Sequence, residues 1–199
     1  MKTVKINDFM FKKILDGTKH CICKYSRKQL EYIRIEVKAN SIVAYALDGY
    51  RAARVVISCK QPNTDEFVCY IKPFSVKESK SGIGIVTLSL NEETKEAFAE
   101  VDTEYGKLRY CFNQIGCEWD IKIEEIFDNA KVHDREIAVN AAMIAQMFSA
   151  ISHITSDRNN LCVIESKDAR MQPFCITATD SDILCEQLIL PIRRSGDEK

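Results

Sequence analysis

The stretch Ser41–Ile57, SIVAYALDGYRAARVVI, decides how the rest of the chain is interpreted. Apolar, β-rich runs precede and follow the polar group Asp48-Gly49-Tyr50-Arg51. Asp-Gly between such runs is a strong turn signal, because glycine accepts positive φ and aspartate can hydrogen-bond its own backbone. The sequence therefore predicts a hairpin or a kinked strand over this stretch.

The composition is that of an ordinary globular protein. The 199 residues are 46% hydrophobic and 29% charged, enough to bury a real core. No apolar run approaches the ~20 residues that cross a bilayer, and the N-terminal stretch is too charged for a signal peptide. Nine cysteines without such a signal favour reduced thiols in the cytoplasm. A net charge of −1 leaves nucleic-acid binding open, because a local basic stripe is enough for phosphate contacts.

The chain opens with a strand, a helix and three further strands. Lys2–Ile6 is the first expected strand, and Asn7-Asp8 offers an N-cap to a helix that Gly17 should end. Tyr32–Val37 alternates as a half-buried strand does, and the two strands of the opening stretch follow it. The first unit is therefore β-α-β-β-β.

A second unit repeats this order with weaker signals. The segment Asn91–Val101 has high helix propensity but also alternates, and we prefer a turn followed by a strand. Trp119–Phe127 closes the unit with mixed aromatic and acidic residues. The other expected elements are a strand at Phe67–Ile71, a short helix at Pro73–Lys80 stopped by Gly82, and strands at Ile85–Leu90 and Lys107–Phe112.

A third unit follows a polar segment. Its expected elements are a strand at Ile137–Val139, a helix at Asn140–Ser152, and strands at Leu161–Glu165, Phe174–Thr179 and Asp182–Ile192. We predict an α+β fold of antiparallel sheets with helices packed on one face. The expected organisation is a two-unit domain over 1–128, a linker over 129–135, a third unit over 136–194 and a polar tail over 195–199.

Two segments carry a resemblance to a known family. Ala46–Ala53, ALDGYRAA, is similar to the A-T-D-G-H-R-L-A segment of the bacterial DNA polymerase III beta subunit, the sliding clamp. Leu188–Arg193, LILPIR, is similar to the V-V-M-P-M-R-L strand that closes that family's chain. The resemblance implies a DNA-clamp fold made of β-α-β-β-β units.

Two further similarities fall in the family's order. Gly116–Phe127 resembles the segment that closes the family's middle domain, and Ile137–Asn140 resembles the start of its last half-domain. The resemblance implies that residues 1–128 correspond to the middle domain and 134–194 to the second half of the last domain. This chain would then contain three units, whereas a full clamp chain contains six.

The family binds short peptides from polymerases and the clamp loader in a groove between its middle and last domains. Such an apolar groove with one arginine suits a peptide with Leu or Phe anchors. Tyr50 and Ala52 replace the family's His and Leu and would reshape the groove. A buried turn, with Arg51 in a structural ion pair, is the alternative. The implied groove residues are Leu47, Gly49, Tyr50, Arg51, Ala52, Leu188, Leu190, Pro191 and Ile192.

The family also lines its ring with helices whose basic side chains face the phosphates of DNA. The third expected helix has no Lys or Arg, and only Arg158 follows it. Lysines on solvated helix faces are the alternative interpretation. The implied DNA-binding residues are Lys12, Lys13 and Lys19 on the first helix and Lys72, Lys77 and Lys80 around the second.

The sequence gives little support for a metal site or a catalytic site. His20-Cys21-Ile22-Cys23 lacks a second Cys/His pair at a zinc-finger spacing. The chain has no phosphate-binding glycine loop and no nucleophile motif. We expect no cofactor, no metal and no enzymatic activity. The cysteines expected to pack in the core are Cys69, Cys162, Cys175 and Cys185.

Two functions from different classes are the main hypotheses, and an enzyme of unknown type is the third, because the absence of a motif is weak evidence. The first is a clamp-like processivity or accessory factor that associates with duplex DNA and docks partner peptides. The second is a protein–protein adaptor or decoy derived from a clamp, without DNA binding. A lone third unit would expose a strand edge, so we expect a homodimer whose third units complete one pseudo-domain. Two such dimers could close a twelve-unit ring.

Overall fold

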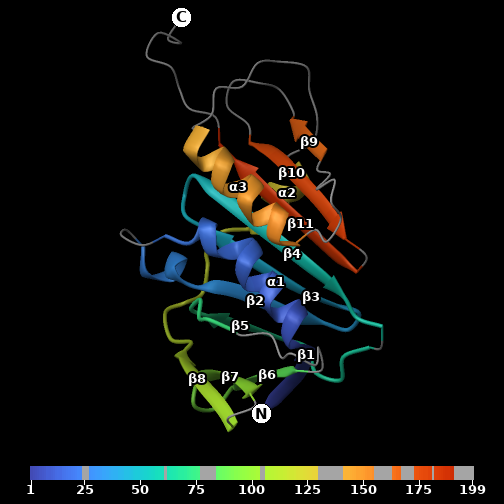
Figure 1. Cartoon of the computed structure of the whole chain (residues 1–199). Helices are drawn as coiled ribbons and strands as arrows, with labels where there is room; N and C mark the ends of the chain where they lie inside the picture. The colour runs from blue at the N-terminus through green and yellow to red at the C-terminus, as the bar shows by residue number, and fades with distance from the viewer. Residues whose placement is uncertain are drawn as a thin grey trace, which may run out of the picture.

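Two antiparallel sheets, with helices packed on them, make up the computed structural model of the chain (Figure 1). The α+β class predicted from the sequence is therefore confirmed. The structure describes residues 1–23, 27–60, 62–76, 84–103, 106–129, 141–154, 163–166, 173–180 and 182–190. Within these residues, no helix combines the length and the apolar character needed to cross a membrane.

The four-stranded sheet has the order β1-β6-β7-β8 and the seven-stranded sheet the order β5-β2-β3-β4-β11-β10-β9. The first comprises β1 (Lys2–Asn7), β6 (Ile85–Asn91), β7 (Glu96–Thr103) and β8 (Gly106–Asn113). The second comprises β5 (Phe67–Ile71), β2 (Ile33–Lys38), β3 (Ser41–Leu47), β4 (Arg51–Ser58), β11 (Ile183–Ile189), β10 (Phe174–Asp180) and β9 (Val163–Ser166). The helices are α1 (Asp8–Thr18), α2 (Ile123–Asn129) and α3 (Ala141–Ile154), with 3₁₀ turns η1 (Lys19–Cys21) and η2 (Lys28–Glu31).

The predicted hairpin is present as β3 and β4. The Asp48 side chain accepts the backbone N–H groups of Tyr50 at 2.9 Å and Arg51 at 2.8 Å. Gly49 has a φ of 92°, in the left-handed region that glycine adopts without a steric penalty. The Asp-Gly pair thus closes the turn for the reasons that made it a signal in the sequence.

Helix α1 begins as predicted but continues through Gly17. Asn7 caps it, because its side chain accepts the N–H of Phe9 at 3.0 Å. The prediction that Gly17 ends the helix is wrong by one residue. A Cβ at Gly17 would lie 2.7 Å from Ile154 Cδ1 and 2.7 Å from Val55 Cγ2. The missing side chain therefore lets α1 approach α3 and β4 closely.

The predicted helix over Pro73–Lys80 is wrong for its described part. Pro73–Val76 is not helical, and the remainder lies outside the described residues. Phe74 explains the conformation, because its ring stacks on Tyr110 at a centroid distance of 4.1 Å and packs against Phe112 at 5.9 Å. An irregular segment here covers the core where a helix was expected.

Helix α2 was not predicted, although its sequence carries a short helical pattern. Ile123 and Phe127, four residues apart, are both buried. Two turns of helix thereby bury one apolar side against the sheet while Glu124 and Glu125 occupy its first turn. Helix α3 was predicted and is confirmed; it ends at Ile154, two residues beyond the expected end, and Asn140 lies outside the described residues.

Both faces of the seven-stranded sheet are covered. Ala44 and Val55 point toward α1 in a core shared with the four-stranded sheet. Tyr45, one position beyond Ala44, and Ala52, three positions before Val55, belong to a second core with α2. Figure 1 shows α1 and α3 on the near face and α2 behind. We call the side of the sheet packed against α1 the α1 face and the side packed against α2 the α2 face.

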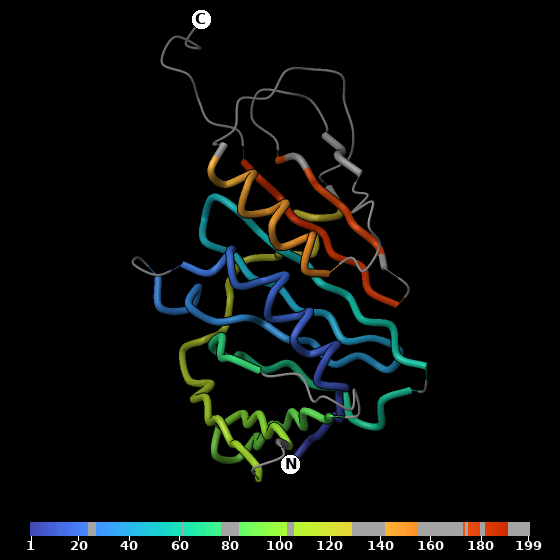
Figure 2. Tube along the Cα trace, viewed as in Figure 1, coloured from blue at the N-terminus to red at the C-terminus, as the bar shows by residue number. Residues whose placement is uncertain are grey.

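Strands β4 and β11 join the first unit to the third. They pair antiparallel from Arg51 opposite Ile189 to Ile57 opposite Ile183. Each is the last strand of its unit, so the order β2-β3-β4-β11-β10-β9 runs symmetrically outward from the junction. Helices α1 and α3 contact each other over it (Figure 2). The first two units interlock differently, because β5 pairs with β2 and β1 pairs with β6.

Candidate functional site

The implied peptide groove centres on the turn between β3 and β4, and Arg51 is its most constrained residue. The Arg51 guanidinium donates to Asp48 Oδ2 from Nε at 2.9 Å and from Nη2 at 2.7 Å. Its Nη1 donates to the side chain of Gln146 on α3. Only 13% of the Arg51 side chain is exposed. Arg51 therefore ties the turn to α3 on the α1 face of the sheet.

The apolar residues of the implied groove lie on the other side. Leu47, Ala52 and Leu188 are buried in one cluster with Ile123 and Phe127 of α2. The sheet itself separates these three side chains from the contact that Arg51 makes with α3. The structure thus divides the implied set between the two faces instead of gathering it in one groove.

Tyr50 and Leu190 form the exposed apolar part of the implied groove. Tyr50 is 67% exposed and Leu190 is 43% exposed. They are neighbours, because the Leu190 N–H donates to the Tyr50 carbonyl oxygen at 3.1 Å. Pro191 and Ile192 lie outside the described residues. Together with the exposed turn tip at Gly49, this pair presents an apolar edge to solvent.

The Cys/His segment beside the turn is packed rather than arranged for a metal. Cys21 is buried with Ala46 and Ala53, and burial raises the pKa of its thiol. Burial, and then the positive charges of Lys19 and Arg51, lower the pKa of His20. Among the described residues, no three His, Cys, Asp or Glu side chains lie close enough to hold a metal ion. Of the cysteines expected in the core, Cys69, Cys175 and Cys185 are buried, and Cys162 lies outside the described residues.

The sequence did not reveal the polar links that hold α2 to the sheet. Arg54 of β4 pairs with Glu186 of β11, reaches Asp128 at 3.2 Å and lies 4.8 Å from the Phe127 ring centroid. These contacts join three segments that are far apart in the sequence. The only sign of these contacts in the sequence was the aromatic and acidic composition around Trp119–Phe127.

Glu124 makes a second link between α2 and the sheet. It accepts from Lys38 Nζ at 2.9 Å and from the Tyr45 hydroxyl at 3.0 Å. The Lys38 contact, more than any other, lowers the pKa of Glu124 to about 2. The carboxylate therefore stays charged at all ordinary pH values and keeps both partners in place.

Two of the three lysines implied in DNA binding on the first predicted helix contact other groups of the protein. Lys19 lies just past α1, as the first residue of η1, and pairs with Asp16 at 2.6 Å. Lys13 donates to the His153 carbonyl at the end of α3 and lies 4.9 Å from the Phe9 ring centroid. These contacts leave the lysines on the α1 face but hold two of them to protein groups.

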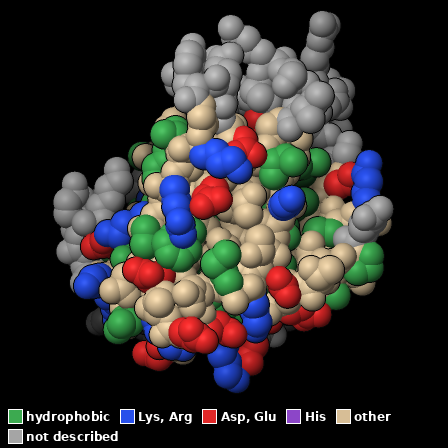
Figure 3. Space-filling view, turned by 90° about the horizontal axis from the view of Figure 1, so that it is seen from below, with side chains coloured by type: hydrophobic (Ala, Val, Ile, Leu, Met, Phe, Trp, Pro, Cys, Tyr) green, Lys and Arg blue, Asp and Glu red, His purple; other side chains and the backbone are tan. Residues whose placement is uncertain are grey.

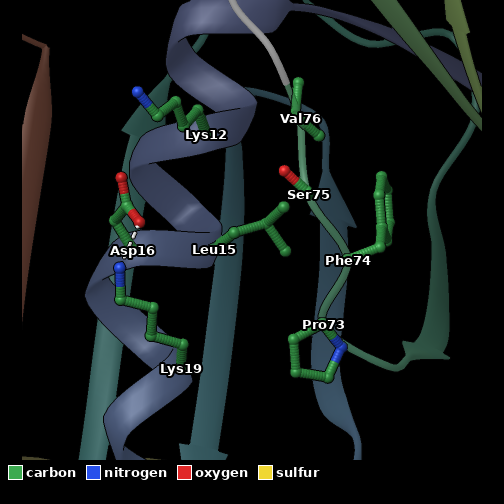
Figure 4. A pocket seen from close by; sticks show the side chains of 8 residues that line it. All are labelled: Lys12, Leu15, Asp16, Lys19, Pro73, Phe74, Ser75 and Val76. Carbon is green, nitrogen blue, oxygen red and sulfur yellow. Dashed lines mark hydrogen bonds and ion pairs between the residues drawn. The ribbon is translucent and has the colours of Figure 1, made fainter.

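A cleft of about 410 Å³ opens between α1 and the segment at 73–76 (Figure 4). Figure 4 shows Lys12, Asp16 and Lys19 along one side of α1, with Leu15 pointing toward the segment. Lys72 precedes this segment and pairs with Glu31 at 2.8 Å, while Lys77 and Lys80 lie outside the described residues. The cleft residues are Lys12, Leu15, Asp16, Lys19, Pro73, Phe74, Ser75 and Val76.

Comparisons of sequence with protein-family models and with curated proteins give no match. Solved structures do match. A structure assigned as a DNA polymerase III beta subunit from Eubacterium rectale gives a TM-score of 0.70 at 13% identity, covering 98% of this chain and 66% of that one. The DNA polymerase III beta subunit from Pseudomonas aeruginosa gives a TM-score of 0.65 at 11% identity, covering 98% of this chain and 67% of that one.

A eukaryotic protein matches as well. Proliferating cellular nuclear antigen from Entamoeba histolytica gives a TM-score of 0.61 at 9% identity, covering 96% of this chain and 99% of that one. The chain spans about two thirds of the bacterial structures. At these identities the likeness concerns the fold, and it agrees with the resemblance read from the sequence. The chain has the fold of the DNA polymerase III beta subunit sliding clamps.

Proposed function

We propose that this protein is a clamp-like, non-enzymatic accessory or processivity factor that associates with duplex DNA. The observation that carries the proposal is the side-by-side placement of α1 and α3 on one face of a continuous sheet, within a sliding-clamp fold. Such a helix-covered face can lie along a duplex and contact phosphates without reading sequence.

The charges on this face support a weak DNA contact. Lys12 and Lys13 lie on α1, whereas α3 carries no Lys or Arg. A contact made by few lysines has a shallow dependence on salt, because few counterions are released. We therefore propose loose association, in which retention on DNA depends on the assembly more than on affinity.

The test is duplex binding by the full chain, measured by fluorescence anisotropy over a salt series. Reversing two charges on α1 (Lys12→Glu with Lys13→Glu) should weaken binding at least about tenfold and flatten the salt slope. The matched control is Lys122→Glu, an exposed lysine beside α2 that pairs with Glu125 at 2.8 Å. Equal binding by the α1 variant and the control would contradict the proposed face.

An adaptor without DNA binding is the second candidate, and the absence of basic residues from α3 favours it. In both candidates we propose that partner peptides dock against the apolar edge formed by Tyr50 and Leu190. Their exposure and their contact through the backbone support this position.

A peptide with Leu or Phe anchors is the probe for docking. Tyr50→Ser should reduce its affinity by about tenfold or more in calorimetry, because an exposed aromatic anchor is lost without disturbing the core. Val68→Ser, an apolar residue of β5 that is 40% exposed, is the control. Unchanged affinity in the Tyr50 variant would place any peptide site elsewhere. Peptide binding without duplex binding would favour the adaptor.

We also propose self-association through the third unit. Among the strands that the structure describes, β9 ends the seven-stranded sheet, and we propose that its outer edge accepts a strand from another chain. In the first two units, the first strand of each unit pairs with the second strand of the other: β1 pairs with β6, and β5 pairs with β2. Two third units that exchanged strands in the same way would make a two-fold dimer.

A further inference from the structure

The last strands of the units follow one pairing rule within the chain. Strands β4 and β11, the last strands of the first and third units, pair antiparallel with each other over seven residue pairs. The last strand of the second unit is β8, which ends the four-stranded sheet and pairs with β7 only, as far as the described residues show. The rule therefore leaves one last strand without a counterpart in the described chain.

We propose that β8 pairs antiparallel with β8 of a second copy of this protein, in a two-fold contact separate from β9. The order β6-β7-β8-β8-β7-β6 would repeat the symmetric order around β4 and β11. An isologous contact of this kind needs the same surface on both partners, which an antiparallel pair of identical edge strands supplies.

The side chains of β8 on the core side suit such a contact. Phe112 is buried, and Tyr110 stacks beneath Phe74 at 4.1 Å. Leu108, two positions along the same side of the strand, is 53% exposed. In a register centred on Tyr110, Leu108 lies opposite Phe112 of the second copy. The pairing would thus extend the row of apolar residues and cover Leu108, which is now exposed to solvent.

The basic side chains on the other side of β8 do not oppose the contact. Charged residues on an edge strand usually discourage pairing. Here Lys107 lies 3.3 Å from Asp102, and Arg109 lies 3.4 Å from Glu100 of β7. In the same register Arg109 faces Cys111 of the second copy, and the two Arg109 side chains are diagonal neighbours that each keep Glu100 as an ion-pair partner, so no like charges stand directly opposite each other. Figure 3, seen from below, shows acidic and basic side chains interspersed with apolar ones on this side of the molecule.

The first test is sedimentation velocity of the full chain over a concentration series, without DNA. Leu108→Lys should raise the dissociation constant for self-association about tenfold or more, because it places a charge beside the two-fold axis. Ile115→Lys is the matched control, since Ile115 is 69% exposed and lies beyond the strand. Thermal melts should be equal for both variants.

The second test locates the contact. In this register the two Cys111 residues are diagonal neighbours, roughly 7–8 Å apart. A short bismaleimide should therefore crosslink the wild-type chain into dimers, and Cys111→Ser should abolish that product. A wild-type chain that stays monomeric, or crosslinking that survives Cys111→Ser, would overturn the proposal. Neither readout involves DNA, and only the β8 contact depends on Leu108 and Cys111, so an unchanged response of these two variants would count against β8 and not against DNA association or the β9 contact proposed above.

Discussion

Replacing Gln114 by leucine is expected to lower the free energy of unfolding by about 3–5 kcal/mol, because it removes three hydrogen bonds to buried backbone groups and takes away the partner of both the Tyr70 N–H and the Tyr70 carbonyl. The Gln114 side chain accepts the Tyr70 N–H at 2.7 Å and donates to the Tyr70 carbonyl at 2.8 Å. It also donates to the Phe112 carbonyl at 2.8 Å. One buried amide thus joins β5 of one sheet to β8 of the other.

Urea denaturation of the purified chain measures this effect. Glu93→Leu is a suitable control, because Glu93 is exposed in the turn between β6 and β7. The control should stay within about 0.5 kcal/mol of the wild type. A loss below about 1 kcal/mol for Gln114→Leu would mean that water replaces the amide at the Tyr70 N–H and the Tyr70 carbonyl.

The second large effect is expected at the junction of the first and third units. Arg54→Met removes the partner of Glu186, whose side chain is only 13% exposed. Removing one partner of a fully buried ion pair costs about 3–5 kcal/mol. Arg54 and Glu186 each retain some exposure, so we expect about 2–3 kcal/mol for this variant.

A double-mutant cycle separates the ion pair from the loss of Arg54 packing on Phe127. Adding Glu186→Leu to Arg54→Met should restore about 1–2 kcal/mol, because no charge then remains buried without a partner. Strict additivity of the two single changes would show that the pair is not coupled. Since the two residues lie on β4 and β11, the loss should appear as earlier separation of the third unit.

Local signals in the sequence were enough to predict most elements. The Asp-Gly turn and the Asn7 cap act in the structure as they do in isolated peptides, through contacts within three residues. The strand over 96–101 was also predicted, against its helix propensity, because alternation reflects burial on one side of a sheet. These features needed no knowledge of distant parts of the chain.

The errors have a common physical cause, which is contact with distant residues. Phe74 holds its segment out of a helix by stacking on Tyr110, and Gly17 stays helical because α3 and β4 approach it. The division of the implied groove has the same origin. Whether Arg51 and Ala52 share a face depends on strand alternation, which places adjacent residues on opposite sides. The resemblance identified the segments, and only the sheet determined where their side chains point.

The junction between β4 and β11 also bears on how the chain folds. Arg54 and Glu186 are 132 residues apart, yet their strands are central in the larger sheet. Such high contact order makes folding slow, because a long loop must close before the pairing compensates its entropy. Until that happens, β4 presents an unpaired edge to other nascent chains, and aggregation competes with folding. Expression yield should therefore respond to temperature and to chaperones more strongly than the stability of the finished fold would suggest.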